Sequence, residues 1–110
     1  MSKPQLPVLT HLQFLVLGVL RSEDLPGRTL REALSGYGIR RTGPAVYQLM
    51  ALLEKDRLVV GRYEQITVGD QAVTERRYRI TAEGKKRWSE ARAFYEHVAR
   101  AATKLRWSDA

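Results

Sequence analysis

The spacing of apolar and polar residues changes several times along the chain, and each change marks a new predicted element. Helical spacing begins after Thr10, which can cap a helix together with Gln13 in a capping box, and continues to about Leu20. Apolar residues cover nearly the whole circumference of this helix, so we expect it to be buried on more than one side. Pro26 suits the first turn of a second helix, which the glycines of residues 36–38 should end.

A third helix is predicted to begin near Thr42–Pro44, with Thr42 or Gly43 as its cap. The apolar spacing predicts a buried stripe, flanked by Met50 and made of Val46, Leu49, Leu52 and Leu53. The remaining polar residues of this helix should face solvent.

Two strands follow, because residues 58–66 and 75–80 are rich in β-branched and aromatic side chains. Residues 67–74 should join them through a turn at Gly69–Asp70. Thr81 is the expected cap of a last helix of about two dozen residues. This order is that of a winged helix-turn-helix, so the expected fold is mainly α with a small β-hairpin and a long C-terminal helix.

Composition narrows the function of such a fold. The net charge of +7 over 110 residues favours a polyanionic partner, such as nucleic acid or an anionic membrane surface. The absence of cysteine removes disulfides and thiolate chemistry and fits a cytoplasmic location. The longest apolar run, residues 12–20, is too short to span a bilayer, so we expect no membrane segment.

Residues suited to catalysis or metal binding are few. His11 and His97 lie in different predicted helices, and neither has a partner at the spacing of metal ligands. Neither a glycine-rich nucleotide loop nor a GxSxG nucleophile motif occurs. We therefore expect no enzyme activity, no metal and no cofactor.

Two arginines, Arg40 and Arg41, precede the third helix, although the N-terminus of a helix is already positive. Cations there are explained if an external anion binds at that end. The second helix of a helix-turn-helix lies in the major groove, so these arginines would meet a DNA phosphate. The alternative is two solvated loop arginines.

The first turns of the third helix hold the candidates for reading DNA. We assign to DNA binding Thr42, Gly43, Tyr47 and Gln48. Glutamine can bind adenine with two hydrogen bonds, and Gly43 allows a close approach of the helix. The alternative for Tyr47 is packing at the edge of the domain with its hydroxyl in water.

A second cationic group on the second strand consists of Arg76, Arg77 and Arg79. Strand alternation puts Arg77 and Arg79 on the face opposite Tyr78, where they should point outward and reach a phosphate or the minor groove. The alternative is an ordinary polar sheet face on which arginines pair with Glu64 or Glu75.

The last helix carries an apolar stripe with a heptad-like spacing of 3, 4, 3, 4 and 3 residues, widened by Phe94 and made of Trp88, Ala91, Tyr95, Val98, Ala102 and Leu105. So small a domain cannot cover a stripe of this length, so we expect a two-fold homodimer. The alternative is a helix folded back on its own domain. A pocket for a planar ligand between the two halves of the dimer could also be lined by Trp88, Phe94, Tyr95 and Trp107.

Four stretches of the sequence carry a resemblance to a known family: "LTHLQFLVLGVL", "GRTLREAL", "GPAVYQLMALLEKDRLV" and "RRYRITAEGKKRW". Over residues 10–95 the chain resembles the PadR-type transcriptional regulators. The resemblance implies a winged-helix protein that binds double-stranded DNA as a homodimer, represses transcription and responds to a small aromatic effector. Two residues depart from the family pattern, since Gln48 stands in place of a common proline and Arg57 in place of a common glycine.

We expect three parts: an N-terminal arm (1–9), a winged-helix DNA-binding domain (10–81) and a C-terminal helix for dimerisation (82–110). We expect a repressor that reads a near-palindromic site with half-sites about one helical turn apart. One rival is a protein-interaction module, either an antirepressor or an assembly factor, which should expose apolar residues on the third helix. The other is an RNA binder, which needs an aromatic platform on the strands.

Overall fold

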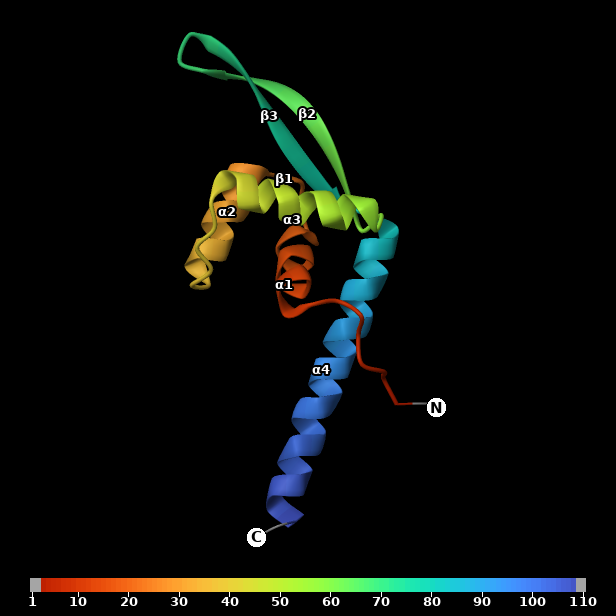
Figure 1. Ribbon diagram of the computed structural model, residues 1–110. Helices are drawn as coiled ribbons and strands as arrows, with labels where there is room; N and C mark the ends of the chain where they lie inside the picture. The colour runs from red at the N-terminus through yellow and green to blue at the C-terminus, as the bar shows by residue number, and fades with distance from the viewer. Residues whose placement is uncertain (1–2, 109–110) are drawn as a thin grey trace.

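The computed structural model describes the backbone of residues 3–108 and the side chains of residues 3–101. The elements in these residues are α1 (His11–Leu20), β1 (Leu25–Pro26), α2 (Gly27–Gly36), α3 (Gly43–Lys55), β2 (Val59–Val68), β3 (Gln71–Ile80) and α4 (Ala82–Ser108). In Figure 1, α3 crosses above α1, the β2–β3 hairpin rises above α3, and α4 runs downward from the end of the hairpin. This arrangement confirms the winged helix-turn-helix with a long C-terminal helix.

The first helix forms as predicted, because its start is fixed by local hydrogen bonds. The backbone N–H of Gln13 donates to Thr10 Oγ1 over 3.1 Å, and the Thr10 N–H donates to Gln13 Oε1 over 3.0 Å. This reciprocal capping box satisfies two N–H groups that a helix start leaves free. Val16, Leu17 and Leu20 of the same helix are fully buried in the core.

The second helix starts one residue later than predicted. Leu25 and Pro26 form the short strand β1, which pairs antiparallel with Tyr78 and Arg77 of β3. The expectation of Pro26 in the first helical turn is therefore wrong, since its backbone is extended, with φ −71° and ψ 156°. Proline lacks an N–H group and is tolerated at a sheet edge, which is where β1 lies in the strand order β1-β3-β2.

The buried face of α3 differs from the predicted stripe at two positions. Val46, Met50 and Leu53 are the buried residues of α3, whereas Leu52 is 57% exposed. Spacing of four and three residues keeps the three buried side chains on one line of the helix, and Leu52 lies to one side of that line. Met50 therefore takes the core position that the sequence pattern gave to Leu52.

The hairpin is longer than predicted, although its turn is correct. β2 and β3 pair over ten residues each, from Val59 opposite Ile80 to Val68 opposite Gln71. The predicted connection 67–74 is therefore mostly strand. Only Gly69 and Asp70 form the turn, and Gly69 has a φ of +63°, as two-residue hairpin turns require.

The last helix begins at a threonine that also holds the end of α3. Thr81 Oγ1 accepts a hydrogen bond from the Gly84 N–H over 2.9 Å and donates one to the Arg57 carbonyl over 2.8 Å. A Cβ atom at Gly84 would collide with the Leu58 carbonyl, so glycine allows this close approach. The start of α4 and the end of α3 are therefore fixed to each other.

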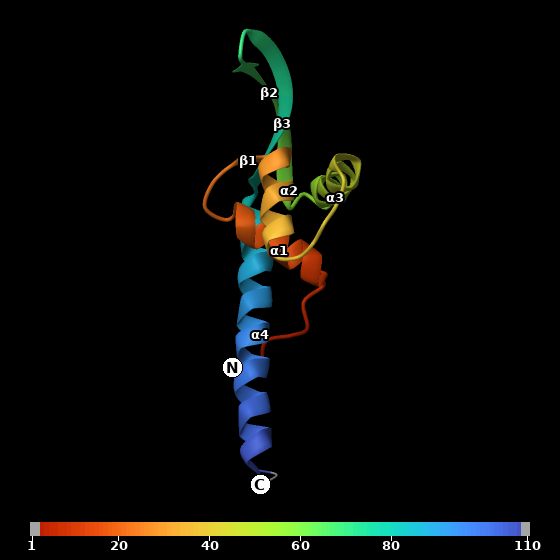
Figure 2. The same cartoon turned by 90° about the vertical axis from the view of Figure 1, so that its left-hand side faces the viewer.

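The molecule is long for its size. Its extents are 65 × 28 × 21 Å and its radius of gyration is 17.3 Å, against about 13 Å for a compact domain of this length. Figure 2 shows that α4 and the hairpin account for the length, while α3, seen nearly end-on, stands out to one side. One end of α4 thus projects far beyond the core.

Two helices end in the same backbone motif, but with different residues at its left-handed position. At the end of α2, Ile39 N–H donates to Leu34 O, and the left-handed residue is Gly38, with φ +82°. At the end of α3, Leu58 N–H donates to Leu53 O, and the left-handed residue is Arg57, with φ +61°. Both are Schellman motifs, in which glycine is the unstrained residue. The departure of Arg57 from the family glycine thus carries backbone strain.

We expect Arg57→Gly to raise the free energy of unfolding by up to about 1 kcal/mol, because relief of the left-handed strain exceeds the added chain entropy of glycine. Gly38→Ala is the matched reverse change and should lower it by about 1 kcal/mol, since no neighbouring atom obstructs a Cβ there. Urea unfolding of both variants measures these effects. A destabilised Arg57→Gly would show that the arginine side chain makes a stabilising contact.

Candidate nucleic-acid interface

One face of α3 is covered by the core and the other is open to solvent. The exposed residues are Gly43, Pro44, Tyr47, Gln48, Ala51, Leu52 and Lys55. A helix of 13 residues is about 20 Å long and fits the major groove of B-DNA, which is about 12 Å wide. The exposed face therefore has the size and shape of a groove-binding element.

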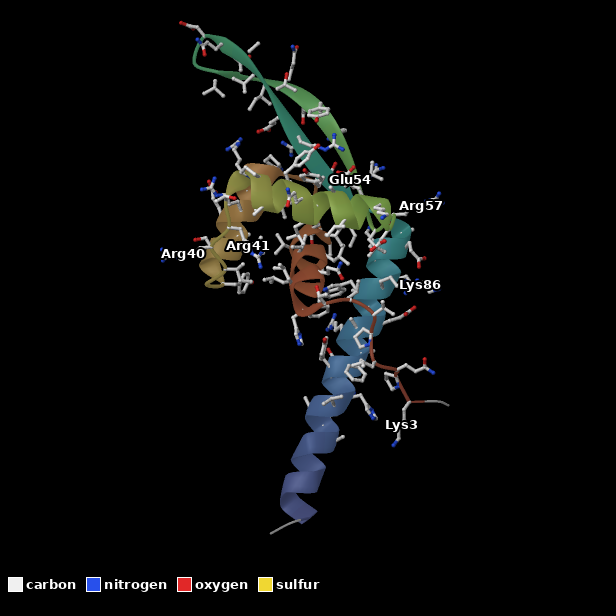
Figure 3. All side chains as sticks on the ribbon, in the orientation of Figure 1. Lys3, Arg40, Arg41, Glu54, Arg57 and Lys86 are labelled. Carbon is white, nitrogen blue, oxygen red and sulfur yellow. The ribbon has the colours of Figure 1, made fainter. Side chains whose placement is uncertain are left out.

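The N-terminal end of α3 is cationic. Thr42 caps the helix, since its Oγ1 accepts a hydrogen bond from the Ala45 N–H over 3.2 Å, and the first turn contains no acidic residue. Arg40 and Arg41 are exposed and form no ion pair within the described residues. Figure 3 shows both side chains on the connection that leads into α3. Two free guanidinium groups thus add to the positive end of the helix dipole.

The helix α2 contributes a further cation that the sequence analysis missed. The Nη1 atom of Arg31 lies 3.9 Å from the point where a Cβ atom of Gly43 would stand, so this guanidinium reaches the first residue of α3. Arg31 is exposed and has no carboxylate partner among the described residues. Arg28 and Arg31 lie three residues apart on α2 and line a hollow of about 250 Å³ between α2, α3 and β3, where Arg28 is paired with Glu75 over 3.1 Å. The spacing of three residues between Arg28 and Arg31, which puts both on one face of a helix, was the sequence signal that could have revealed this cation.

Arg76 faces α3 and is neutralised there. Its Nη2 atom lies 2.8 Å from Glu54 Oε2, and its guanidinium lies 4.7 Å from the centre of the Tyr63 ring. The hydrogen bond to Glu54 is the main cause that raises the pKa of Arg76. The side chains are only 21% and 28% exposed for Arg76 and Glu54. The structure therefore places this arginine in an internal contact between the hairpin and α3.

Arg77 lies on the opposite face of β3 and is also paired. Its Nε atom lies 3.0 Å from Glu64 Oε2, its Nη1 atom lies 3.5 Å from Glu75 Oε1, and its Nη2 donates to the Asp24 carbonyl over 3.3 Å. The Arg77–Glu64 contact lacks hydrogen-bond geometry and is an ion pair only. The side chain is 26% exposed. The expectation that Arg77 points outward is thus corrected in favour of the pairing alternative, because acidic residues flank it on both strands.

The three hairpin arginines therefore do not form one cationic surface. Arg79 is exposed and has no carboxylate partner among the described residues. It borders a hollow at the base of the hairpin whose other charged residues are Arg21, Lys85, Glu23 and Asp24. The outer part of the hairpin, residues 63–75, contains no lysine or arginine. Among the described residues, the unpaired cations at the start of α3 are consequently Arg31 of α2 and Arg40 and Arg41 of the α2–α3 connection.

The predicted dimer stripe of α4 is divided between two environments. Phe14 of α1 stacks on Trp88 with ring centres 5.8 Å apart and contacts Tyr95 with ring centres 5.4 Å apart. Ala91 is fully buried, and Phe94 lies edge-on to Tyr95. This first part of the stripe thus packs within its own subunit, which agrees with the alternative of a helix folded back on its own domain. Val98 is 42% exposed, while the side chains of Ala102 and Leu105 lie outside the described residues.

The described residues contain no group of three histidines, aspartates or glutamates that could hold a metal ion. Among the same residues, no helix combines the length and the apolar character needed to cross a membrane.

The fold and its exposed helix define a winged-helix protein, and comparison with solved structures gives its family. The chain is 30% identical to a PadR family transcriptional regulator from Eggerthella lenta DSM 2243, over 86% of this chain and 80% of that protein, with a TM-score of 0.64. A PadR family regulator from Clostridium difficile R20291 is 14% identical over 87% and 98% of the two chains, with a TM-score of 0.73. Bacillus subtilis PadR in complex with operator DNA is 18% identical over 74% and 46%, with a TM-score of 0.60.

No family model and no curated protein matches the sequence. The 30% identity over most of both chains nevertheless shows the family. The chain belongs to the PadR family of transcriptional regulators, which confirms the predicted resemblance. Because this family consists of regulators, it also confirms that the chain is not an enzyme.

Burial raises the pKa of the Tyr78 phenol above its ordinary value. The unfolded chain therefore releases this proton first, and stability should fall above about pH 10, by up to about 1.4 kcal/mol per pH unit, until the folded phenol also ionises. Below about pH 10 the stability contributed by the protonated Tyr78 phenol is fully present. We expect Tyr78→Phe to lessen the alkaline loss seen in urea unfolding, whereas the exposed Tyr37→Phe should retain it. Equal alkaline slopes for wild type and Tyr78→Phe would contradict this assignment.

Proposed function

We propose that this protein is a homodimeric, sequence-specific repressor that places α3 in the major groove of double-stranded DNA. The observation that carries the proposal is the gathering of unpaired cations, Arg31, Arg40 and Arg41, at the N-terminal end of the exposed helix α3. Phosphate contacts supply most of the affinity of such an interface, and helix N-termini favour anions. The family relative from Bacillus subtilis was solved with operator DNA, which supports the same polyanionic partner here.

Base reading is assigned to the first turns of α3. Gln48 is exposed one turn after Pro44, and its amide can donate to and accept from the major-groove edge of adenine. Gly43 allows a close approach, and the exposed Tyr47 can bind the neighbouring backbone. The Thr42 hydroxyl already caps the helix and can add only a second contact.

The dimer is assigned to the projecting part of α4. A single helix that extends beyond its domain leaves apolar side chains such as Val98 open to water, and a two-fold partner would cover them. Two copies of α3 would then read a near-palindromic site, with half-sites about one helical turn apart.

A hollow of about 220 Å³ between α1 and α4 is the site we assign to a small aromatic effector. Phe14, Tyr37 and Trp88 line it, and the Arg21 guanidinium lies 5.0 Å from the centre of the Trp88 ring. Aromatic walls with one cation suit a planar ligand of neutral or negative charge.

A salt titration of binding to random duplex DNA tests the interface. We expect replacement of both Arg40 and Arg41 by alanine to flatten the log–log salt slope by about 1.8, because each phosphate contact contributes about 0.9. Arg77→Ala should leave the slope unchanged, because that arginine is already paired. Gln48→Ala should change the preferred sequences selected from a random pool more than it changes the slope.

Wild-type binding without a steep salt dependence would contradict the proposal. The rival is then a protein-docking module, for which the exposed Tyr47 and Leu52 on α3 would form the apolar surface. A flatter salt slope for Arg77→Ala would instead show that Arg77 of the hairpin contacts a DNA phosphate.

Sedimentation analysis tests the dimer. We expect Val98→Glu to shift the protein toward monomer, because a carboxylate buried without a partner costs several kcal/mol, on the order of the penalty for an unpaired buried charge. Ser89→Glu adds the same charge to exposed surface on another side of α4 and should leave the dimer intact. A dimer unchanged by Val98→Glu would show that the part of α4 around Val98 does not lie in the dimer interface.

A further inference from the structure

The hairpin and α3 share apolar core contacts at the base of the hairpin, and an ion pair crosses the corner above that base. Glu54, in the last turns of α3, accepts a hydrogen bond from Arg76 of β3 over 2.8 Å. The two residues are 22 positions apart in sequence, and Figure 3 shows Glu54 on the side of α3 from which the hairpin rises. Since both side chains are about three-quarters covered, this pair is less screened by water than a surface ion pair.

The surroundings of the pair leave little room for another arrangement. The Arg76 guanidinium lies over the Tyr63 ring, at 4.7 Å from its centre, and 5.8 Å from the centre of the Tyr78 ring. On β2, a Cβ atom at Gly61 would stand 2.6 Å from Glu54 Oε1 and 2.7 Å from Arg76 Nη2. Gly61 thus provides the space in which the two charged groups meet, and any side chain there would push them apart.

The contact matters because the backbone connection at this corner is short. Asp56–Leu58 alone separate α3 from β2, and the buried Leu58 and Val59 hold the base of the hairpin in the core. The Glu54–Arg76 pair therefore acts on the part of the hairpin above this base. The outer half of the hairpin extends away from the helices (Figure 1), and a contact near its base therefore controls the position of its tip.

We propose that the Glu54–Arg76 pair, in the space left by Gly61, fixes the angle between the hairpin and the DNA-reading helix α3. Arg76 is then a positioning residue that acts through Glu54, not a phosphate ligand. This inference rests on the proposed DNA-binding function, because the angle matters for function only if both elements meet one duplex.

The angle itself can be measured without DNA. The chain has no cysteine, so Ser35→Cys on α2 and Asp70→Cys at the hairpin turn can carry two spin labels at defined places. We expect a narrow distance distribution in this labelled parent. Glu54→Gln, Arg76→Gln and Gly61→Ala should each broaden or shift it, and the exchanged pair Glu54→Arg with Arg76→Glu should restore it. Gly36→Ala is the matched glycine control, since nothing lies within 4 Å of a Cβ there.

DNA binding distinguishes positioning from simple electrostatics. Glu54→Gln adds one net positive charge beside α3 and would tighten binding if charge alone decided. We expect the opposite: about tenfold weaker binding to the selected site, the value of one misplaced base contact, with the salt slope unchanged. Gly61→Ala should act in the same direction without changing any charge, and the exchanged pair should recover most of the affinity.

The outcomes separate the two proposals. Unchanged distance distributions in all three single variants would overturn the proposal that the Glu54–Arg76 pair fixes the angle of the hairpin, whatever the DNA result. Tighter site binding by Glu54→Gln, or a salt slope that falls by about 0.9 in Arg76→Gln and is not recovered by the exchanged pair, would also overturn it in favour of a direct phosphate contact. Absence of DNA binding by wild type would overturn the proposed function, while the distance measurement would still decide the geometry.

Discussion

The burial of one face of α3 is the constraint on which the arrangement of charge depends. Val46, Met50 and Leu53 are packed into the core shared by α1, α2 and the sheet, so the rotation of α3 about its own axis is fixed. Once this face points inward, Gln48 must point outward and Glu54 must lie toward the hairpin. The same burial that stabilises the domain thus decides which residues can meet DNA and which can meet β3.

The distribution of paired and unpaired cations is uneven as a result. The sheet side carries Arg62, Arg76 and Arg77, each within 3.0 Å of a carboxylate oxygen. Arg31, Arg40 and Arg41, near the start of α3, have no such partners among the described residues. Paired charges contribute little to the field outside a protein, whereas unpaired ones attract a polyanion. The positive end of α3 is therefore the natural point of contact for a phosphate backbone, and the hairpin serves a more structural purpose at its base.

Local signals were sufficient for the parts of the fold that depend on local hydrogen bonds. The Thr10 capping box, the Thr42 and Thr81 caps and the Gly69–Asp70 turn each involve residues close in sequence, so the sequence predicted them correctly. The strand β1 and the Glu54–Arg76 pair connect distant segments, and no periodic pattern reports such partners. Strand alternation correctly placed Tyr78 in the core, but it could not show that acidic residues would neutralise Arg77. Leu52 and Met50 were exchanged because both are apolar and Leu52 lies beside the true stripe, to which Met50 belongs.

The geometry of the proposed dimer is tied to α3 through α1. Phe14 stacks on Trp88, which fixes α4 to α1, and Leu17 of α1 belongs to the same core as Met50 of α3. Close-packed interiors transmit displacement because their side chains cannot compress. A change in the position of α4 at the dimer contact would consequently move α3 relative to its partner copy. The hollow beside Trp88 lies within this chain of contacts, so a planar ligand there could change the separation of the two reading helices without touching either of them.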